Sequence, residues 1–383
     1  MQGNKDRILT THVGSLPRTV EVLDAMKAKL GGEDYNDAAY QAQIAKGVEG
    51  IVKLQADLGI DVVADGEMSK SGFFTYIEER MEGFEPRKNE KFQMFEAEIA
   101  AFPEYYEDYF ARAMLGGTVV PMFPMYCVGP VAYRGQEAVK KDIENLKAAL
   151  GGVDVEAAFM PATAPAGVGY NEFYNTEEEF AEAVAEALRE EYEAIIDAGL
   201  LLQIDDPFLC DILVDPALDE KGKDRKANTY VEAINHSLRN IPEEKVRFHT
   251  CYGINEGPRI HEAPMDYVTR YMLNVNAGGY SFEAANPRHE HEYHIWEDIK
   301  LPEGRALIPG VITHASNIVE HPELIAERLV RYAKLVGREN VLAGGDCGFS
   351  SQACYHTEVH PTVIWAKFEA MVEGARLATK QLW

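Results

Sequence analysis

Apolar residues recur along the chain at two spacings, one typical of amphipathic helices and one typical of short buried strands. In the segment 40–59, apolar side chains such as Ile44 and Val48 return every three to four residues until Gly59 ends the stripe. The segment 60–67 follows with an apolar run that closes in acidic residues. The first spacing predicts a helix and the second predicts a strand, and this helix-to-strand unit recurs.

Nine segments have the apolar composition of strands, and helical stretches separate most of them. The candidate strands are 8–19, 60–67, 119–131, 157–169, 200–207, 246–253, 278–287, 305–317 and 340–350. Alternating helices and strands favour a parallel α/β sheet, and 383 residues suffice for one large barrel. We therefore expect a single TIM-type (β/α)8 barrel domain over residues 1–383. Nine candidates exceed eight strands by one, and we expect the first to lie partly across the barrel mouth.

The segment 70–118 interrupts this alternation. It is rich in aromatic residues, among them Phe73, Phe74, Tyr105 and Tyr106. We interpret the segment as an inserted helical subdomain, and two roles stay open for it: a subunit contact and a lid over the site.

The charge balance of the chain is strongly acidic. Thirty-seven Lys and Arg residues stand against 63 Asp and Glu residues, which gives a formal net charge of −26. Such a chain repels the phosphate backbone of nucleic acids at long range, so we exclude nucleic acid as a partner. Much of the excess acid lies in helical stretches such as 177–193, where it would form a solvated surface. The alternative explanation for the excess of acidic residues is that the protein comes from an organism adapted to high salt.

Cysteine usage and the lengths of apolar runs indicate a cytoplasmic protein. The five cysteines include no CxxC pair, and an odd, sparse count favours reduced thiols over a disulfide framework. No apolar run reaches the roughly 18 residues that a membrane span needs, so we expect no membrane partner. The first residues lack the apolar core of a secretion signal. The sequence leaves open whether the chain forms a homo-oligomer.

Polar, reactive side chains follow the apolar part of several candidate strands. Two of them, His249 and Cys251, stand two residues apart, so their side chains leave one strand end on the same side. Glu283 and Cys347 close two other candidate strands. In an α/β barrel the carboxyl ends of the strands share one face, where active sites are built. We therefore expect these four residues to converge.

Two thiolates, one imidazole and one carboxylate are a suitable tetrahedral shell for Zn²⁺. For His249 and Cys251 alone, the alternative is a core cysteine beside a hydrogen-bonded histidine. Glu283 and Cys347 at equivalent strand ends favour zinc, and the lack of CxxC pairs argues against a closed structural site. Such a site can exchange its carboxylate for an incoming thiol, which zinc would hold as thiolate. That exchange activates a sulfur nucleophile.

Seven motifs, in order along the chain, carry a resemblance to a known family. They are THVGSLPR, VVADGE, LLLQIDDP, FHTCYG, YSFEAANPRHEHE, IPGVITHASN and LAGGDCGFS. With them the chain resembles the cobalamin-independent methionine synthases, both the C-terminal catalytic barrel of the long enzymes and the short single-barrel members. The resemblance implies zinc as the cofactor, with His249, Cys251, Glu283 and Cys347 as its ligands.

The resemblance also implies a site for homocysteine. Ser15 in the Gly-Ser loop would hold the carboxylate of the amino acid, and Glu67 and Asp205 would hold its ammonium. Two carboxylates suit one ammonium, and the backbone N–H groups of a loop suit one carboxylate. The alternatives are a plain turn for Ser15 and a helix cap or salt bridge for each acid.

His314 matches the histidine that serves the family as proton donor to the leaving group. This task suits an imidazole near neutral pH. The ITHASN motif is one residue shorter than the family's pattern around that histidine, and the alternative is a packed or solvent-facing histidine.

We therefore expect a zinc-dependent enzyme that transfers a methyl group to a small thiol, with homocysteine as the favoured acceptor and methionine as its product. The methyl donor stays open between a folate, a corrinoid-bound methyl group and another donor. The reason is that Thr163 to Ala166 replace the aromatic folate platform that the family carries after its fourth strand.

Three alternatives remain for the function. An enzyme similar to the epoxyalkane:coenzyme M transferases would share the zinc-thiolate chemistry, but its sulfonate thiol would need a pocket arginine or lysine in place of Glu67 and Asp205. A non-catalytic zinc-binding barrel would have no open ligand position. A barrel similar to the porphyrin-type decarboxylases would bind no zinc.

Overall fold

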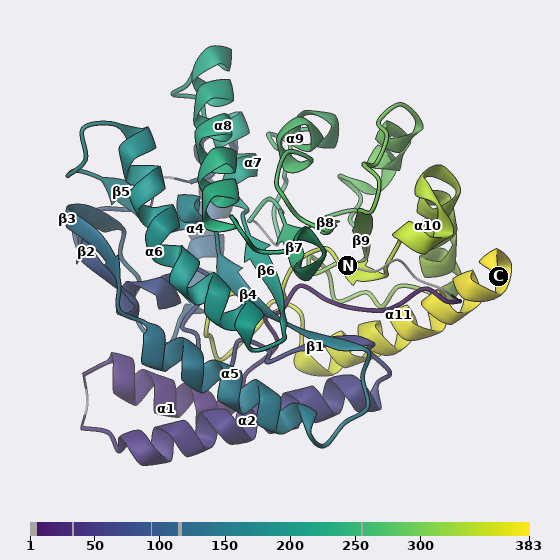
Figure 1. The fold of residues 1–383 in the computed structure, drawn as a ribbon, viewed down its shortest axis with the longest axis horizontal. Helices are drawn as coiled ribbons and strands as arrows, with labels where there is room; N and C mark the ends of the chain where they lie inside the picture. Colours follow the sequence, from purple (N-terminus) through teal and green to yellow (C-terminus); the bar gives the residue numbers. More distant parts are fainter. Residues whose placement is uncertain (1–5, 33, 93, 114–116, 254–255) are drawn as a thin grey trace.

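A parallel sheet of seven strands forms the centre of the fold, and helices cover its outer side (Figure 1). The structure is a computed structural model that describes residues 6–32, 34–92, 94–113, 117–253 and 256–383. In spatial order the strands are β1 (Val62–Ala64), β4 (Ala157–Thr163), β6 (Leu201–Asp205), β7 (Val246–His249), β8 (Gly279–Phe282), β9 (Ala306–Ile312) and β10 (Gly344–Gly345). Their order in space follows their order in the chain, so their carboxyl ends lie on one face. The predicted alternation of strands and helices is confirmed.

The N-terminal segment joins the two edges of this sheet. Thr10 makes a parallel bridge to Ala343, and Thr11 makes one to Val62. The Thr11 N–H donates to the Ala343 carbonyl at 2.8 Å. These contacts supply an eighth strand and close the sheet into the predicted barrel.

The expectation that the first candidate strand lies across the barrel mouth is therefore wrong, because that segment supplies the closing strand. The extra candidate is the third one, whose residues form β3 (Met125–Tyr133). In a separate sheet β3 pairs antiparallel with β2 (Met81–Pro86) and parallel with β5 (Tyr170–Asn171), and β2 and β3 lie at the left edge of Figure 1. Most β3 residues are half-buried or exposed, whereas the strands of an α/β barrel are buried on both faces.

Helices wrap the outside of the barrel (Figure 1). The α-helices are α1 (Val20–Leu30), α2 (Asp37–Asp57), α3 (Glu96–Ala101), α4 (Pro103–Arg112), α5 (Gln136–Leu150), α6 (Glu177–Asp197), α7 (Phe208–Val214), α8 (Glu220–Ser237), α9 (Met265–Met272), α10 (Pro322–Val336) and α11 (Pro361–Leu382). Short 3₁₀ helices are η1 (Thr75–Glu79), η3 (Pro165–Gly167), η4 (Glu243–Lys245), η5 (Glu290–Glu297) and η6 (Arg338–Asn340). None of the described helices is both long enough and apolar enough to cross a lipid bilayer.

The boundaries of α6 show how local sequence sets these helices. The Thr176 side chain accepts from the Glu179 N–H at the start of the helix, and the glutamates of the first turn interact favourably with the helix dipole. Phe180 and Leu188 lie on its buried face. Gly199, with φ of 86°, follows the end of the helix and lets the chain turn into β6.

The inserted segment 70–118 forms a small core of its own near the carboxyl-end face of the barrel. Tyr106 and Tyr109 of α4 are buried among other aromatic side chains of the segment. The Tyr109 hydroxyl donates to Glu358 Oε1 at 2.7 Å, and the His261 N–H donates to Glu98 Oε1 at 2.6 Å. Both contacts reach loops that follow barrel strands. The described part of the segment contains α3 and α4, and it also contributes β2, which its composition did not indicate.

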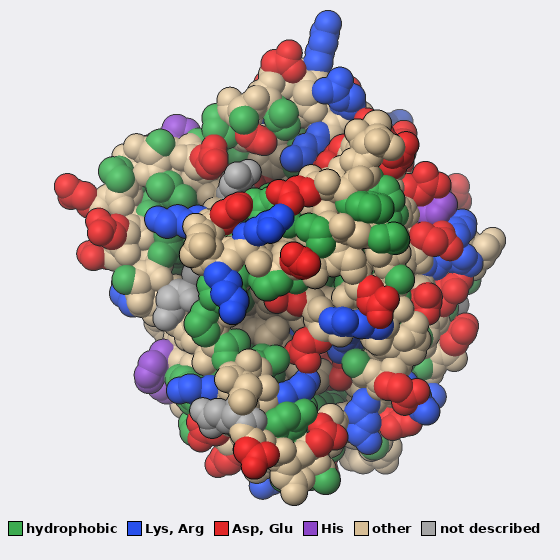
Figure 2. Space-filling view, turned by 90° about the vertical axis from the view of Figure 1, so that its left-hand side faces the viewer, with side chains coloured by type: hydrophobic (Ala, Val, Ile, Leu, Met, Phe, Trp, Pro, Cys, Tyr) green, Lys and Arg blue, Asp and Glu red, His purple; other side chains and the backbone are tan. Residues whose placement is uncertain are grey.

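Acidic side chains are spread over the surface that Figure 2 shows, where they alternate with Lys and Arg side chains and with apolar ones. No single acidic patch dominates that face.

Arg247 of β7 ties the closing strand to the barrel interior. Its buried guanidinium donates from Nη1 to Thr11 Oγ1 at 2.9 Å and from Nη2 to the His12 carbonyl at 2.8 Å. The same group lies 3.8 Å from the centre of the Phe159 ring. Burial lowers the pKa of Arg247 to about 9, so the guanidinium stays charged at neutral pH.

We expect Arg247→Ala to lower the free energy of unfolding by about 3 kcal/mol, because it removes two charge-assisted hydrogen bonds and leaves a cavity. Urea denaturation followed by circular dichroism measures this loss. The control is Arg376→Ala, since Arg376 pairs with Glu373 on an exposed helix face and should contribute far less. An equal loss in both variants would contradict the role of Arg247 in holding the closing strand.

Candidate metal and substrate site

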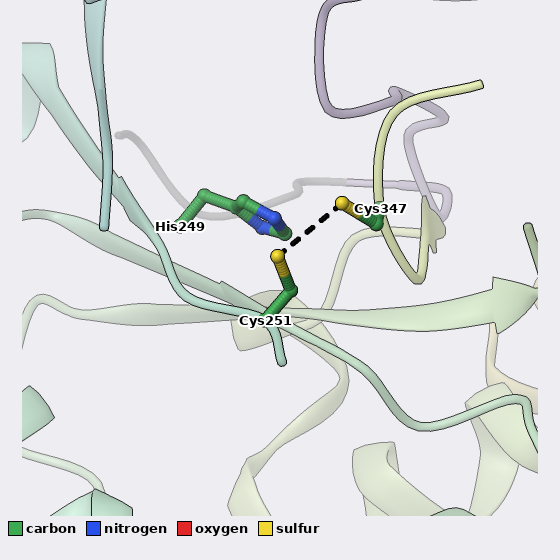
Figure 3. A group of neighbouring side chains, drawn as sticks. All are labelled: His249, Cys251 and Cys347. Atoms are coloured by element: carbon green, nitrogen blue, oxygen red, sulfur yellow. Dashed lines mark hydrogen bonds between the residues drawn. The ribbon is translucent and has the colours of Figure 1, made fainter. Parts of the chain in front are cut away.

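Three potential metal ligands meet at the carboxyl-end face of the barrel. His249 ends β7, Cys251 follows two residues later, and Cys347 follows β10. Their ligand atoms all lie within 4.8 Å of one another, and all three residues are buried. Figure 3 shows the imidazole and both sulfurs pointing toward a common centre. The Cys347 thiol donates to Cys251 Sγ at 3.3 Å, close to the roughly 3.8 Å expected for two sulfurs on a tetrahedral zinc.

The hydrogen bond and the protonation state of His249 suit its side chain to bind a metal ion. His249 Nδ1 lies 3.0 Å from Ser281 Oγ, whereas its Nε2 atom is buried without a hydrogen-bond partner. Burial lowers the pKa of His249 to about 3, so the imidazole is neutral. A neutral imidazole fixed through one nitrogen and open at the other is the form that binds a metal ion. The donor set of one imidazole and two thiols therefore fits zinc.

Glu283, the predicted fourth ligand, lies beside the trio but outside it. One of its oxygens accepts from the Tyr252 N–H at 3.1 Å. The other accepts from Arg259 Nη2 at 2.6 Å and from Asn286 Nδ2 at 2.8 Å. Burial by itself would raise the pKa of Glu283, but Arg259 lowers it to about 2. The carboxylate is therefore charged and is held by protein donors.

His314, the predicted proton donor, belongs to a second buried group. The ligand atoms of Glu283, His314 and Asp346 lie within 4.8 Å of one another. Asp346 is fixed by the backbone N–H groups of Ala284 and Ala285, each 2.7 Å from its Oδ1 atom. Burial and the nearby Glu283 charge raise the pKa of Asp346 to about 6. His314 thus lies next to the predicted carboxylate ligand.

One cavity brings together six of the eight residues predicted for the site. These are Ser15, Glu67, Asp205, His249, Cys251 and Cys347. The cavity encloses about 830 Å³ when its space open to solvent is counted. Neither Glu283 nor His314 is among the described residues that line it.

The two predicted ammonium ligands are buried in this cavity. Burial and the charge of Glu67 raise the pKa of Asp205 well above its usual range, and burial raises the pKa of Glu67. Gln203 Nε2 donates to Asp205 Oδ1 at 2.8 Å, whereas Glu67 Oε2 is buried without a hydrogen-bond partner. Two buried carboxyl groups with spare acceptor capacity would be stabilised by a cation.

The backbone holds Glu67 in a strained conformation. Its φ of 58° lies in the left-handed region, which costs about 1 kcal/mol or more in a residue with a side chain. Arg18 Nη2 donates to the Glu67 and Lys70 carbonyls, each at 2.8 Å, and fixes this turn. Strain of this kind is concentrated at functional sites, where the surrounding structure maintains it.

Ser15 and Gly348 pack against each other across the junction between the first and last strands. The Phe349 N–H donates to the Ser15 carbonyl at 3.0 Å. A Cβ atom at Gly348 would overlap Ser15 Oγ, so this close approach requires glycine. Ser15 is thereby placed in the same cavity as Cys347.

Three basic side chains that position the site were not predicted from the sequence. They are Arg18, Lys70 and Arg259, all of them buried. Lys70 Nζ lies 4.2 Å from the centre of the Tyr76 ring and donates to the Pro161 carbonyl. Each residue lies in a loop and acts through contacts that are distant in sequence, so no periodic pattern indicates it.

The chain as a whole is similar to known proteins. The family model described as the catalytic domain of the cobalamin-independent synthases matches residues 8–120 and 163–375. A 5-methyltetrahydropteroyltriglutamate–homocysteine methyltransferase of Mycolicibacterium paratuberculosis is 24% identical over 372 residues, which cover 96% of this chain and 42% of that protein. The methionine synthase of Sulfolobus acidocaldarius is 23% identical over 88% of this chain and 85% of its own length.

Solved structures include one with the same fold. The B12-independent methionine synthase of Shewanella sp. W3-18-1, solved in complex with selenomethionine, superposes with a TM-score of 0.70. It is 18% identical and covers 98% of this chain and 99% of its own. At this identity the match supports the barrel fold.

Proposed function

This chain belongs to the family of cobalamin-independent synthase catalytic domains, and we propose that it transfers a methyl group to the thiol of homocysteine to give methionine. The observation that supports this most is the cavity itself. It unites His249, Cys251 and Cys347, which fit a zinc ion, with Glu67 and Asp205, which fit an ammonium group. A small thiol that carries an amino group matches both halves of the cavity.

The acceptor would bind through its charged ends. Glu67 and Asp205 lie buried on one side of the cavity and would take the ammonium, which would favour their ionised forms. The loop at Ser15 would take the carboxylate. With these ends held, the thiol would point toward His249, Cys251 and Cys347, since all of them line the same cavity. Such fixed orientation lowers the entropic part of the reaction barrier.

His249 Nε2 and the sulfurs of Cys251 and Cys347 would hold the zinc ion, with Glu283 as a fourth ligand before the substrate binds. When bound, zinc keeps an incoming thiol ionised at neutral pH and so makes it a nucleophile. Ser281 would hold the His249 ring in its metal-binding tautomer. Burial of the whole trio would exclude water from the reacting sulfur.

His314 would supply a proton to the leaving group of the methyl donor. Its imidazole lies in the buried group with Glu283 and Asp346 and is not among the described residues that line the cavity. The role therefore requires the reaction space to extend past Glu283 in the loaded enzyme. An imidazole is suited to donate a proton near neutral pH.

A second, larger cavity would take the methyl donor. It is lined by aromatic side chains that include Phe74, Phe92, Phe123 and Phe208, and it encloses about 1500 Å³ when its space open to solvent is counted. Ala166, from the loop where the sequence lacks the family's aromatic platform, also lines it. Phenylalanines from other segments thus provide flat apolar surfaces here. These surfaces support a donor with a planar ring system, such as a folate.

The residues that line the first cavity, which holds His249, Cys251 and Cys347, argue against a sulfonate thiol as acceptor. Among the described residues that line the cavity with the trio there is no lysine or arginine. A sulfonate placed there would face Glu67 and Asp205, and burying like charges together is unfavourable.

A thiol panel measured by X-ray absorption at the zinc edge tests the proposed function. We expect homocysteine to replace one oxygen or nitrogen ligand by sulfur, and methionine, which has no free thiol, to leave the ligands unchanged. A response to a sulfonate thiol alone would favour the coenzyme M type of enzyme. A site that responds to no thiol would contradict the proposal.

A further inference from the structure

We propose that Arg259 is a positioning residue that receives the Glu283 carboxylate when an incoming thiol displaces it from the metal. The inference rests on the proposed function, in which the metal binds at His249, Cys251 and Cys347. In this proposal Arg259 controls the exchange between a metal site with Glu283 bound and a site from which Glu283 has been displaced by the thiol.

Protein donors hold both oxygens of the Glu283 carboxylate in this structure. The carboxylate is 2.6 Å from Arg259 Nη2, and the side chains are 0% and 3% exposed. Its other oxygen accepts from the N–H of Tyr252, the residue that follows Cys251. Glu283 therefore lies directly beside a proposed metal ligand while both of its oxygens are occupied by protein donors. A short rotation of its side chain would exchange these donors for the metal.

Arg259 is itself firmly anchored, so it can serve as a fixed acceptor of the carboxylate. Its Nε atom donates to Glu262 Oε1 at 2.5 Å, and Glu262 Oε2 lies 2.8 Å from His289 Nε2. The His289 ring stacks on the Tyr252 ring with 4.2 Å between ring centres. Arg259 has a φ of 58°, a strained conformation that these contacts maintain.

The energetic reason for such an arginine is that a carboxylate cannot leave a metal ion into a buried space without a new partner. An ionised carboxylate that loses its partner in a low-dielectric interior is strongly destabilised. Arg259 Nη1 is buried without a hydrogen-bond partner, so the guanidinium keeps a donor for this exchange. By stabilising the displaced carboxylate, Arg259 would make thiol binding easier and metal binding by Glu283 weaker.

This reasoning predicts two effects of opposite sign for Arg259→Met. In protein loaded with Co²⁺, whose absorption spectrum reports sulfur ligation, the homocysteine concentration for half-saturation should rise about tenfold. Loss of the metal to a chelator in the absence of thiol should become slower by a similar factor, because Glu283 stays on the metal. Damage to the fold alone would make metal loss faster.

Two further variants complete the experiment. Arg259→Gln also removes the charge, and its shorter side chain places a donor only about where Arg259 Nε lies, toward Glu262, so it should show the same two effects. If Arg259→Met does not fold, the same two measurements on Arg259→Gln test the proposal. The control is Arg328→Met, since Arg328 is equally buried and pairs with Glu290 but has no contact with Glu283. Its homocysteine titration and its rate of metal loss should match those of the wild type.

Unchanged half-saturation by homocysteine in both Arg259 variants would overturn the inference, and so would faster metal loss in a folded Arg259 variant. In either case the homocysteine response of the wild type would still support the proposed function. A wild-type protein whose Co²⁺ spectrum does not respond to homocysteine would instead overturn the proposed function, and the role of Arg259 with it.

Discussion

Replacement of Cys347 by serine is expected to lower the zinc content from about one ion per chain to roughly a tenth of that. Cys347 Sγ lies 3.3 Å from Cys251 Sγ, close enough for the two sulfurs to bind the same ion. A serine hydroxyl stays protonated at neutral pH and is a poor ligand for zinc, and the three remaining ligands His249, Cys251 and Glu283 would bind the ion weakly. Elemental analysis after dialysis against a chelator measures the change.

Cys354→Ser is the matched control for this prediction. Cys354 lines the same cavity, but its thiol donates to the His356 carbonyl at 3.3 Å and is not part of the trio. The control should keep its zinc. Full retention of zinc by the Cys347 variant would show that the trio is not the metal centre.

The second large effect is expected when the acidic pair loses its charge. In Glu67→Gln combined with Asp205→Asn, kcat/KM for homocysteine should fall about a thousandfold, because each charge-assisted contact to the ammonium contributes roughly 1.5–3 kcal/mol. The loss should be much smaller for the homocysteine analogue without an amino group. Steady-state kinetics with both thiols measure the difference.

The control for the acidic pair is Asp206→Asn. Asp206 is adjacent to Asp205 and equally buried, but its Oδ1 atom accepts from the Leu209 N–H at 3.0 Å at the start of α7. This variant should lower stability and leave the preference for an amino-bearing thiol intact. If the double variant and the control lose that preference to the same degree, the acids do not bind the ammonium.

Regular elements could be predicted from the sequence because burial of one face imposes a period. In α2 the apolar positions Ile44 and Val48 are both buried, as their spacing indicates. The first candidate strand, 8–19, was also recognised from its apolar residues, but its position as the closing strand could not be predicted in this way. Only Thr10 and Thr11 make its bridges, and two residues are too few to show a period. β3 was misassigned as a barrel strand for the converse reason, because its apolar residues lie in a small, half-exposed sheet.

The convergence of His249, Cys251 and Cys347 could be predicted because strand geometry places these residues. His249 and Cys251 share one side of a strand end, and the barrel topology brings Cys347 to them. The orientation of Glu283 could not be predicted, since it depends on Arg259. That arginine lies in a loop, in a left-handed conformation that no sequence pattern signals. The sequence thus indicated which residue types could bind a metal ion. Only the structure could show that Arg259 and Asn286 hold the Glu283 carboxylate.

The closing strand also determines when the site can come into existence during synthesis of the chain. Ser15 follows the closing strand and Cys347 follows β10, and the Thr11 N–H joins these two segments by donating to the Ala343 carbonyl. A nascent chain that ends before residue 347 therefore lacks Cys347, one of the proposed metal ligands. Contacts between the two ends of a long sequence form late in folding, since the loop between them must close first. The proposed site is thus absent from every chain that ends before residue 347.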